Sequence, residues 1–243
     1  MRQEKNSYFS LVNERREQTR SSGFTLIELL VVLAIITVIM GIVFSSQSSF
    51  NKTLILTNTA YDIALTLRDA ESYGLGSRAA TGGVSNAGYG VDFQSASPGQ
   101  FTFFADTYPA PSASGSACHP NLSGDASSPT ALPGDCTYEP STTQNPNFDQ
   151  KVTSYTLGNG ITVSDFCIPD AGGNEFCKVH NGLTWLDVVF SRPNPSAFIR
   201  AGVGSFIDVG SSACITLTSP QGGFRYVSIA SSGEITANAA SCP

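Results

Sequence analysis

The sequence from 24 to 44 reads FTLIELLVVLAIITVIMGIVF, 21 nearly unbroken apolar positions. As an α-helix with a rise of ~1.5 Å per residue, this stretch would be about 31 Å long, which matches the hydrocarbon thickness of a bilayer. Residues 24–44 are therefore predicted to form a helix that can span a membrane.

Charged residues are divided unevenly around this apolar stretch. Residues 1–23 contain five of the 13 lysines and arginines and three of the 19 acids, so eight bases and sixteen acids follow. Because the basic flank of a membrane helix stays in the cytoplasm, we expect the N-terminus inside the cell and the rest of the chain outside. The acidic remainder disfavours bulk electrostatic binding to nucleic acid.

All six cysteines follow the apolar stretch, and no two are spaced Cys-x-x-Cys. An even number of cysteines on the outer side of a membrane indicates disulfide bonds formed in an oxidising compartment. The sequence leaves the connectivity open. Pairing of sequence neighbours, which we expect, would join Cys118 to Cys136, Cys167 to Cys177 and Cys214 to Cys242.

Glu28 lies five residues into the apolar stretch, where an ordinary membrane anchor has no acid. A carboxylate costs roughly 2.5 to 3.5 kcal/mol at the centre of a membrane helix and less near its end. A secretory signal peptide would have an apolar region of about 7 to 15 residues before a small-x-small cleavage site, which is shorter than this stretch. A plain signal anchor would explain the length and orientation of the helix but would not explain Gly23 at its boundary or Glu28 within it.

The segment Ser22-Gly23-Phe24-Thr25-Leu26-Ile27-Glu28-Leu29-Leu30 resembles the prepilin peptidase recognition sequence of type IV pilins, type II secretion pseudopilins and competence pilins. The resemblance implies cleavage between Gly23 and Phe24 by a membrane aspartyl peptidase on the cytoplasmic face, and then N-methylation of the new Phe24 amine. It also implies that Glu28 neutralises such an amine, commonly that of a neighbouring subunit. In a medium of low dielectric this attraction offsets desolvation and penalises misregister during assembly.

Two features depart from the pattern of major pilins. The leader, residues 1–23, is long, and no proline lies near the end of the apolar stretch, since none occurs before Pro98. These departures favour a minor pilin or pseudopilin, groups in which both features vary more.

After Phe44 the helical pattern becomes amphipathic. Apolar residues recur at spacings of four and three, which predicts a helical stem over residues 45–73 with one face on a core. Glycines between residues 74 and 83 mark its end. The recurring residues are Leu56, Ala60, Ile63, Leu67 and Ala70.

The remaining residues, 74–243, are predicted to form an antiparallel β head, so the fold class is α+β and pilin-like. Strands at 88–93 and 100–105 flank the turn residues Ser97-Pro98-Gly99, and residues 106–150 form a polar insert outside the core. Further strands are predicted at 152–157, 161–166, 183–190, 214–218, 224–229 and 234–236. The order GYGVDF, FTFFAD, insert, CITLTS, FRYVSIA and SGEI is similar to the minor pseudopilin H and fimbrial protein T group over residues 45–243.

The sequence offers no motif for catalysis. The only histidines are His119 and His180, and His180 has no neighbouring nucleophile motif, so we expect a surface histidine and no enzyme. Oxygen ligands that would suit Ca²⁺ surround one cysteine pair, and some pseudopilins bind calcium, but the EF-hand spacing is absent. We expect a polar hairpin closed by a disulfide and no resident cofactor or metal. The oxygen-bearing residues are Asp165, Asp170, Asn174 and Glu175.

DNA capture is a further alternative, because some pilins of the fimbrial T type use arginines near the C-terminus to grip phosphates. Here Arg225 stands alone, Glu234 has the wrong sign, and residues 236–243 contain no base, so we expect no DNA-binding residues. Aromatic residues of the strands are interpreted as sheet core and not as platforms for base stacking. These are Tyr89, Phe101, Phe103, Phe104 and Tyr226.

The sequence therefore predicts a structural subunit that is anchored in the bacterial inner membrane and then enters a filament. The expected partners are the prepilin peptidase, other pilin or pseudopilin subunits, the inner-membrane assembly platform and, before assembly, the lipid bilayer. A DNA-capturing competence pilin and an adhesive tip pilin that binds through residues 106–150 remain alternatives; a membrane-tethered enzyme has the least support.

Overall fold

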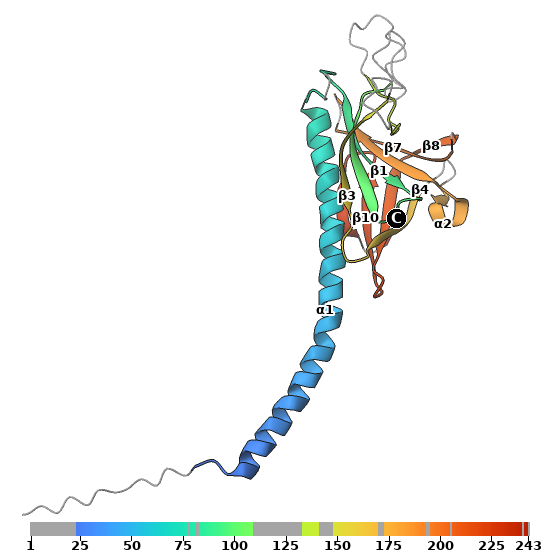
Figure 1. The fold of residues 1–243 in the computed structure, drawn as a ribbon. Helices are drawn as coiled ribbons and strands as arrows, with labels where there is room; N and C mark the ends of the chain where they lie inside the picture. The colour runs from blue at the N-terminus through green and yellow to red at the C-terminus, as the bar shows by residue number, and fades with distance from the viewer. Residues whose placement is uncertain are drawn as a thin grey trace, which may run out of the picture. The chain divides into compact units, whose positions relative to one another are not determined.

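The computed structural model describes residues 23–76, 78–80, 83–108, 133–140, 148–169, 173–192, 195–204, 206–239 and 241–242. The chain divides into two compact units, Met1–Gln47 and Ser48–Pro243, which are taken separately below (Figure 1). Of the predicted leader, only Gly23 lies within the described residues.

Helix α1 spans Leu26–Leu75, 50 residues, and thus continues two residues beyond the predicted end at Tyr73. Gly74, near the end of the helix, lies very close to the strand β6 (Trp185–Phe190). A Cβ at this position would lie 2.1 Å from the carbonyl oxygen of Phe190, so only glycine allows the approach.

The first part of α1, Leu26–Phe44, is long and apolar enough to cross a membrane, and none of it is buried inside the structure. The second part has the predicted amphipathic face. Leu56, Ala60, Ile63, Leu67 and Ala70 are all buried, with at most 2% of the side-chain surface exposed, which confirms the pattern of spacings four and three.

The unit Ser48–Pro243 places two antiparallel sheets against the second part of α1 (Figure 1). The six-stranded sheet has the order β3-β2-β1-β6-β7-β8, and the five-stranded sheet has the order β11-β10-β9-β4-β5. A short helix, α2 (Lys178–Asn181), follows β5. The strands are β1 Gly88–Gln94, β2 Gln100–Asp106, β3 Gln150–Thr156, β4 Thr162–Pro169, β5 Glu175–Cys177, β6 Trp185–Phe190, β7 Ala197–Val203, β8 Phe206–Gly210, β9 Ser212–Thr218, β10 Phe224–Ala230 and β11 Ile235–Ala239.

One hydrophobic core joins the helix to both sheets. Alternate residues of β1 point into it, namely Tyr89, Val91 and Phe93, as period-two alternation requires of a sheet with one face on a core. Two arginines add polar contacts on the helix side: Arg68 donates to the carbonyl oxygen of Ile235 at 3.2 Å, and Arg225 Nε donates to Thr57 Oγ1 at 3.0 Å.

The α+β class and the hairpin of β1 and β2 agree with the sequence prediction, whereas three strands were not predicted. The missing strands are β5, β7 and β8. In β7 the core-facing residues are Ala197, Ile199 and Ala201, and two alanines give a weak strand pattern because alanine is depleted in strands.

The polar insert is not entirely outside the core, and here the prediction was wrong. Asp106 is the last residue of β2, and Cys136 packs on the second face of the six-stranded sheet against Phe104 and Val189, with Tyr138 beside them. Residues 109–132 and 141–147 of the insert lie outside the described residues.

Disulfide bonds fasten the edge and the end of the five-stranded sheet. Cys167 of β4 is bonded to Cys177 of β5, and Cys214 of β9 is bonded to Cys242 after β11. Both pairs are those expected from sequence proximity. Cys136 is also disulfide-bonded, and Cys118, its expected partner, lies outside the described residues.

Candidate functional site

The N-terminal end of α1 is capped by a side chain. Thr25 Oγ1 accepts a hydrogen bond from the backbone N–H of Glu28 at 3.2 Å, and the Thr25 carbonyl oxygen accepts the N–H of Leu29 at 3.2 Å. Thr25 therefore acts as the N-cap, and Thr-x-x-Glu is the capping-box signature. The signature is visible in the sequence as Thr25-Leu26-Ile27-Glu28 and is the signal for this cap.

Glu28 lies in the first turn of α1, where unpaired backbone N–H groups and the helix dipole favour a negative charge. The structure thus gives the carboxylate a role within its own chain, since it stabilises the start of the helix. This role does not compete with pairing to an amine at Phe24, because both depend on a negative charge at the same end of the helix.

Gly23 and Phe24 precede the helix and have few contacts. A Cβ on Gly23 would meet no atom within 4 Å, and Gly23 does not have a positive φ, so the fold does not require glycine there. Phe24 is 83% exposed. A glycine that the fold does not need is consistent with recognition by another protein, which is the role that the sequence analysis expects for Gly23.

The apolar side chains that follow form one continuous exposed surface. The large apolar residues from Phe24 to Phe44 are between 45% and 83% exposed. Soluble monomers rarely expose apolar patches larger than a few hundred Å², so this surface requires lipid or other helices to cover it.

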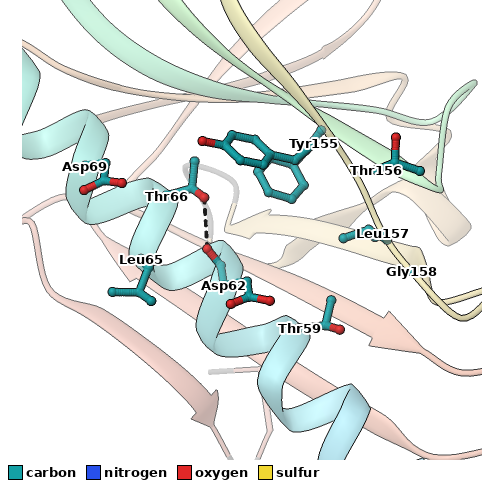
Figure 2. Close-up of a pocket in the computed structure, with 10 residues that line it drawn as sticks. Thr59, Asp62, Leu65, Thr66, Asp69, Tyr155, Thr156, Leu157 and Gly158 are labelled. Carbon is teal, nitrogen blue, oxygen red and sulfur yellow. Dashed lines mark hydrogen bonds between the residues drawn. The ribbon is translucent and has the colours of Figure 1, made fainter.

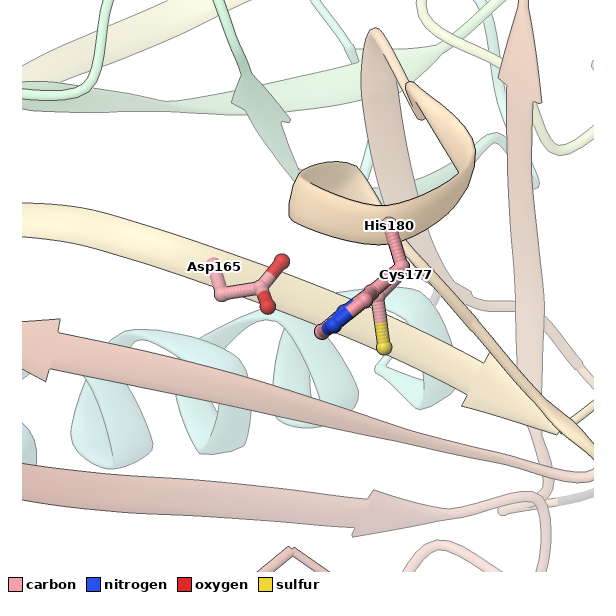
Figure 3. Close-up of side chains that lie close together, drawn as sticks. All are labelled: Asp165, Cys177 and His180. Atoms are coloured by element: carbon pink, nitrogen blue, oxygen red, sulfur yellow. The ribbon is translucent and has the colours of Figure 1, made fainter.

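The predicted oxygen cluster around Cys167 and Cys177 does not form an open cation site in the described residues. Asp165, Cys177 and His180 bring their ligand atoms within 4.8 Å of one another (Figure 3). Cys177, however, is in a disulfide and offers no thiolate. One oxygen of Asp165 accepts the backbone N–H groups of Phe166 and Val179 at 2.9 and 3.1 Å.

Glu175 likewise brings a carboxylate oxygen within 4.8 Å of the sulfurs of Cys167 and Cys177, which are bonded to each other. Asn174, Glu175 and His180 are exposed, and Asp170 lies outside the described residues. The arrangement matches a polar hairpin closed by a disulfide.

A set of buried carboxylates, which the sequence did not reveal, holds the returning part of the insert on the six-stranded sheet. Asp106 accepts the backbone N–H groups of Asp135 and Cys136 at 3.1 and 2.9 Å. Asp187 accepts the N–H of Tyr138 at 2.9 Å. These carboxylates act in place of a neighbouring strand, because they satisfy backbone donors that would otherwise be buried without partners.

Asp149 extends the same arrangement. Its two oxygens accept the backbone N–H groups of Thr107, Tyr108 and Glu139 at 2.8, 3.0 and 3.0 Å. Asp149 therefore ties the residues that follow β2, Thr107 and Tyr108, and the returning residue Glu139 to the start of β3.

Burial changes the protonation of these acids. Desolvation raises the pKa of Asp92 and of Asp149 to about 7. Asp187 lies directly opposite Asp92 on the neighbouring strand, and its pKa is raised by burial and then by the charge of Asp92. Burial, followed by the charge of Asp149, likewise raises the pKa of Asp106. Asp92 and Asp149 therefore take up protons near neutral pH.

The residues considered for DNA contacts are engaged within the chain or buried. The guanidinium of Arg225 donates to Thr57 Oγ1 and, at 2.7 Å, to the carbonyl oxygen of Phe224. The rings of Tyr89, Phe101 and Phe103 are buried in the core, as predicted. Phe104 is buried on the other sheet face, and Tyr226 is half-buried.

The head also has a groove between α1 and β3, which the sequence did not predict (Figure 2). It encloses about 420 Å³. The residues that line it include acids of the helix and an aromatic ring of the strand, Asp62, Asp69 and Tyr155.

Comparison with known proteins identifies the N-terminal segment. Residues 18–44 match the family model described as the prokaryotic N-terminal methylation motif. Neither the curated proteins nor the solved structures contain a match to the chain. The matched residues include Gly23, Phe24 and Glu28 and end at Phe44, where the exposed apolar stretch of α1 also ends.

Proposed function

We infer that the mature protein is a structural filament subunit. The methylation motif and the apolar helix support this inference, because they are the features of a type IV pilin or pseudopilin precursor. We place the protein among the minor subunits of a type IV pilus or a type II secretion pseudopilus. The motif implies processing by a prepilin peptidase and assembly with other pilins. Proteins with this motif are typically structural, and we propose no catalytic activity.

The observation that carries this proposal is the exposed apolar surface of Leu26–Phe44, which begins at a capped turn that holds Glu28. Before assembly, lipid would cover the surface. In the filament, the helices of other subunits would replace the lipid, so the same side chains serve as anchor and as interface. The inner-membrane assembly platform is the expected partner for this exchange.

The proposed topology has the N-terminus in the cytoplasm and the head outside. The basic residues before Phe24 support this orientation through the positive-inside rule. The disulfides of the head support it independently, since such bonds persist in oxidising compartments.

Cleavage after Gly23 would create a cationic amine at Phe24, and Glu28 is the acid available to neutralise it. Burial of an unpaired carboxylate in a filament core costs several kcal/mol, whereas a paired one offsets much of its desolvation. A subunit in the wrong axial position would leave Glu28 unpaired, so the pair would select the correct register.

The test uses the full-length chain in the cells that produce it, with Glu28→Val as the variant and Glu175→Gln, an exposed acid of the head, as the control. We expect both variants to lose their leader normally. Glu28→Val should reduce the amount of this protein in sheared filaments by more than about tenfold, because its partner amine would remain unpaired. Normal incorporation of Glu28→Val would contradict the proposal.

A further inference from the structure

The groove between α1 and β3 is open because it lies at an edge of the six-stranded sheet. β3 is an edge strand of the six-stranded sheet, and its residues Lys151–Thr156 are all exposed. The groove lies entirely within the unit Ser48–Pro243. Its lining consists of Thr59, Asp62, Leu65, Thr66, Asp69, Phe101, Tyr155, Thr156, Leu157 and Gly158.

The helix side of the groove is acidic. Asp62 and Asp69 are seven residues apart, which places both carboxylates on one face of the helix about 10 Å apart along its axis. Both residues are exposed, and no hydrogen bond or ion pair to either carboxylate is found in the part of the chain that the structure describes. The nearby Thr66 hydroxyl donates to the backbone oxygen of Asp62 at 2.9 Å and leaves its carboxylate available (Figure 2).

The strand side supplies an aromatic surface. The Tyr155 ring is 39% exposed and stacks on Phe101, with ring centroids 5.1 Å apart and an angle of 20° between the rings. This stacking holds the ring in place on the sheet. An ordered aromatic ring attracts cations through its electron-rich face, and the effect is larger when the site is partly desolvated.

The combination fits one kind of side chain. A lysine or arginine has an aliphatic stem, for which the 59%-exposed Leu65 is a suitable contact, and a cationic end, for which the ring and the two carboxylates are suitable. Neither carboxylate alone would bind strongly, since an exposed ion pair contributes little. Together with the ring they form a site with charge complementarity to a cation.

We propose that this groove binds a lysine or arginine side chain of a partner protein that is not a second copy of this chain. The inference rests on the proposed function, since the partner would be a neighbouring filament subunit. A second copy is disfavoured because the chain after residue 23 has sixteen acids and eight bases, so two heads repel each other.

The experiment places the photo-crosslinking residue p-benzoylphenylalanine at position 156, an exposed position of the groove, in the full-length chain in its own cells. After irradiation, the crosslinked peptides are identified by mass spectrometry. We expect a crosslink to a different protein, close in sequence to an exposed lysine or arginine. In the variant Asp62→Asn/Asp69→Asn the crosslink should weaken about tenfold.

Two further variants control for charge and for folding. Asp62→Glu/Asp69→Glu keeps both charges and should keep the crosslink, whereas Glu234→Gln removes an exposed acid outside the groove and should not change it. A crosslink to a second copy of this chain, a crosslink insensitive to Asp62→Asn/Asp69→Asn, or no crosslink at all would each overturn the proposal.

Failure of the proposed function is separately visible in the same cells. If the chain is absent from sheared filaments but the charge-dependent crosslink persists in membranes, the filament role is wrong and the groove still binds a cationic partner. If the chain is present in filaments without this crosslink, the groove proposal alone is wrong.

Discussion

Two stretches of α1 have nearly the same secondary structure and opposite surroundings. In Leu26–Phe44 the large apolar side chains are all at least 45% exposed, whereas in the second stretch Leu56, Ile63 and Leu67 are at most 2% exposed. The first stretch is apolar on all sides, and the second is apolar on one face. The comparison shows that the described part of the chain covers only the stretch with an amphipathic pattern, so the other stretch depends on another molecule for its burial.

The largest expected effect concerns the boundary before the first stretch. In the full-length chain, Gly23→Val should leave the leader attached to nearly all molecules, because a β-branched side chain would obstruct a cleft that admits glycine. The fold itself should tolerate the change, since no atom lies within 4 Å of a Cβ at this position. The measurement is the mass of this protein after isolation from membranes, which shows whether the leader is still attached.

Gly41→Val is the matched control for Gly23→Val. A Cβ on Gly41 also meets no atom within 4 Å, and the residue lies inside the exposed stretch, so the leader should be removed normally. A processed product from Gly23→Val would contradict the assignment of the cleavage site.

A pair of leucine substitutions compares the two stretches directly. Leu67→Ala should lower the free energy of unfolding of the head by roughly 2 to 5 kcal/mol, because it leaves a cavity at a fully buried site. Leu33→Ala should leave head stability unchanged, because Leu33 is 56% exposed. Both variants are measured as full-length protein in detergent by urea unfolding, with the fluorescence of Trp185, the one tryptophan, as the reporter. Equal losses of head stability in Leu67→Ala and Leu33→Ala would contradict the difference in burial between the two stretches.

The difference in burial between the two stretches could be predicted from the sequence, because both stretches have strong hydrophobic patterns. An apolar stretch of this length and a four-and-three spacing both predict a helix, so Leu26–Phe44 and the stem could be assigned from the sequence alone. The motif around Gly23 and Glu28 could be found for a different reason: a segment that another protein recognises, as we propose for this one, is local in sequence.

The remaining features depend on contacts between distant residues. The strand β7 has a core face of Ala197, Ile199 and Ala201, which only the neighbouring strand identifies as a strand. The buried acids are less predictable still, because an aspartate in a strand normally indicates a solvent face. Asp187 is buried in a strand that is paired on both sides, and the group that donates to one of its oxygens, the N–H of Tyr138, lies 49 residues away.

These buried acids predict an unusual pH dependence. Since burial raises the pKa of Asp92 and of Asp149 to about 7, above the value near 4 in an unfolded chain, the stability they contribute is present at low pH and is lost as the pH rises through about 7. The melting temperature of the head, residues 48–243, should therefore increase by roughly 10 °C from pH 8.5 to pH 5.

Asp92→Asn should reduce this pH dependence, because it removes one of the groups that take up a proton on folding. Its matched control is Asp165→Asn, which removes a half-buried acid on the other sheet. Thermal unfolding followed by circular dichroism at several pH values measures both. A head that becomes more stable as the pH rises from 5 to 8.5 would contradict the assignment.

The smallest effect concerns the cap of the first stretch. Thr25→Ala removes the oxygen that accepts the Glu28 N–H at 3.2 Å and should loosen the first turn of α1 by about 1 kcal/mol. Thr25→Ser keeps the oxygen and is the control. Hydrogen exchange of the amides from Leu26 to Leu29, measured on the full-length protein in detergent, should be several-fold faster in Thr25→Ala and unchanged in Thr25→Ser. Because nothing else among the residues that the structure describes covers this turn, the cap is the main source of order there. Unchanged exchange in Thr25→Ala would mean that the turn is ordered by its surroundings, and the first stretch would then depend on other molecules for its structure as well as for its burial.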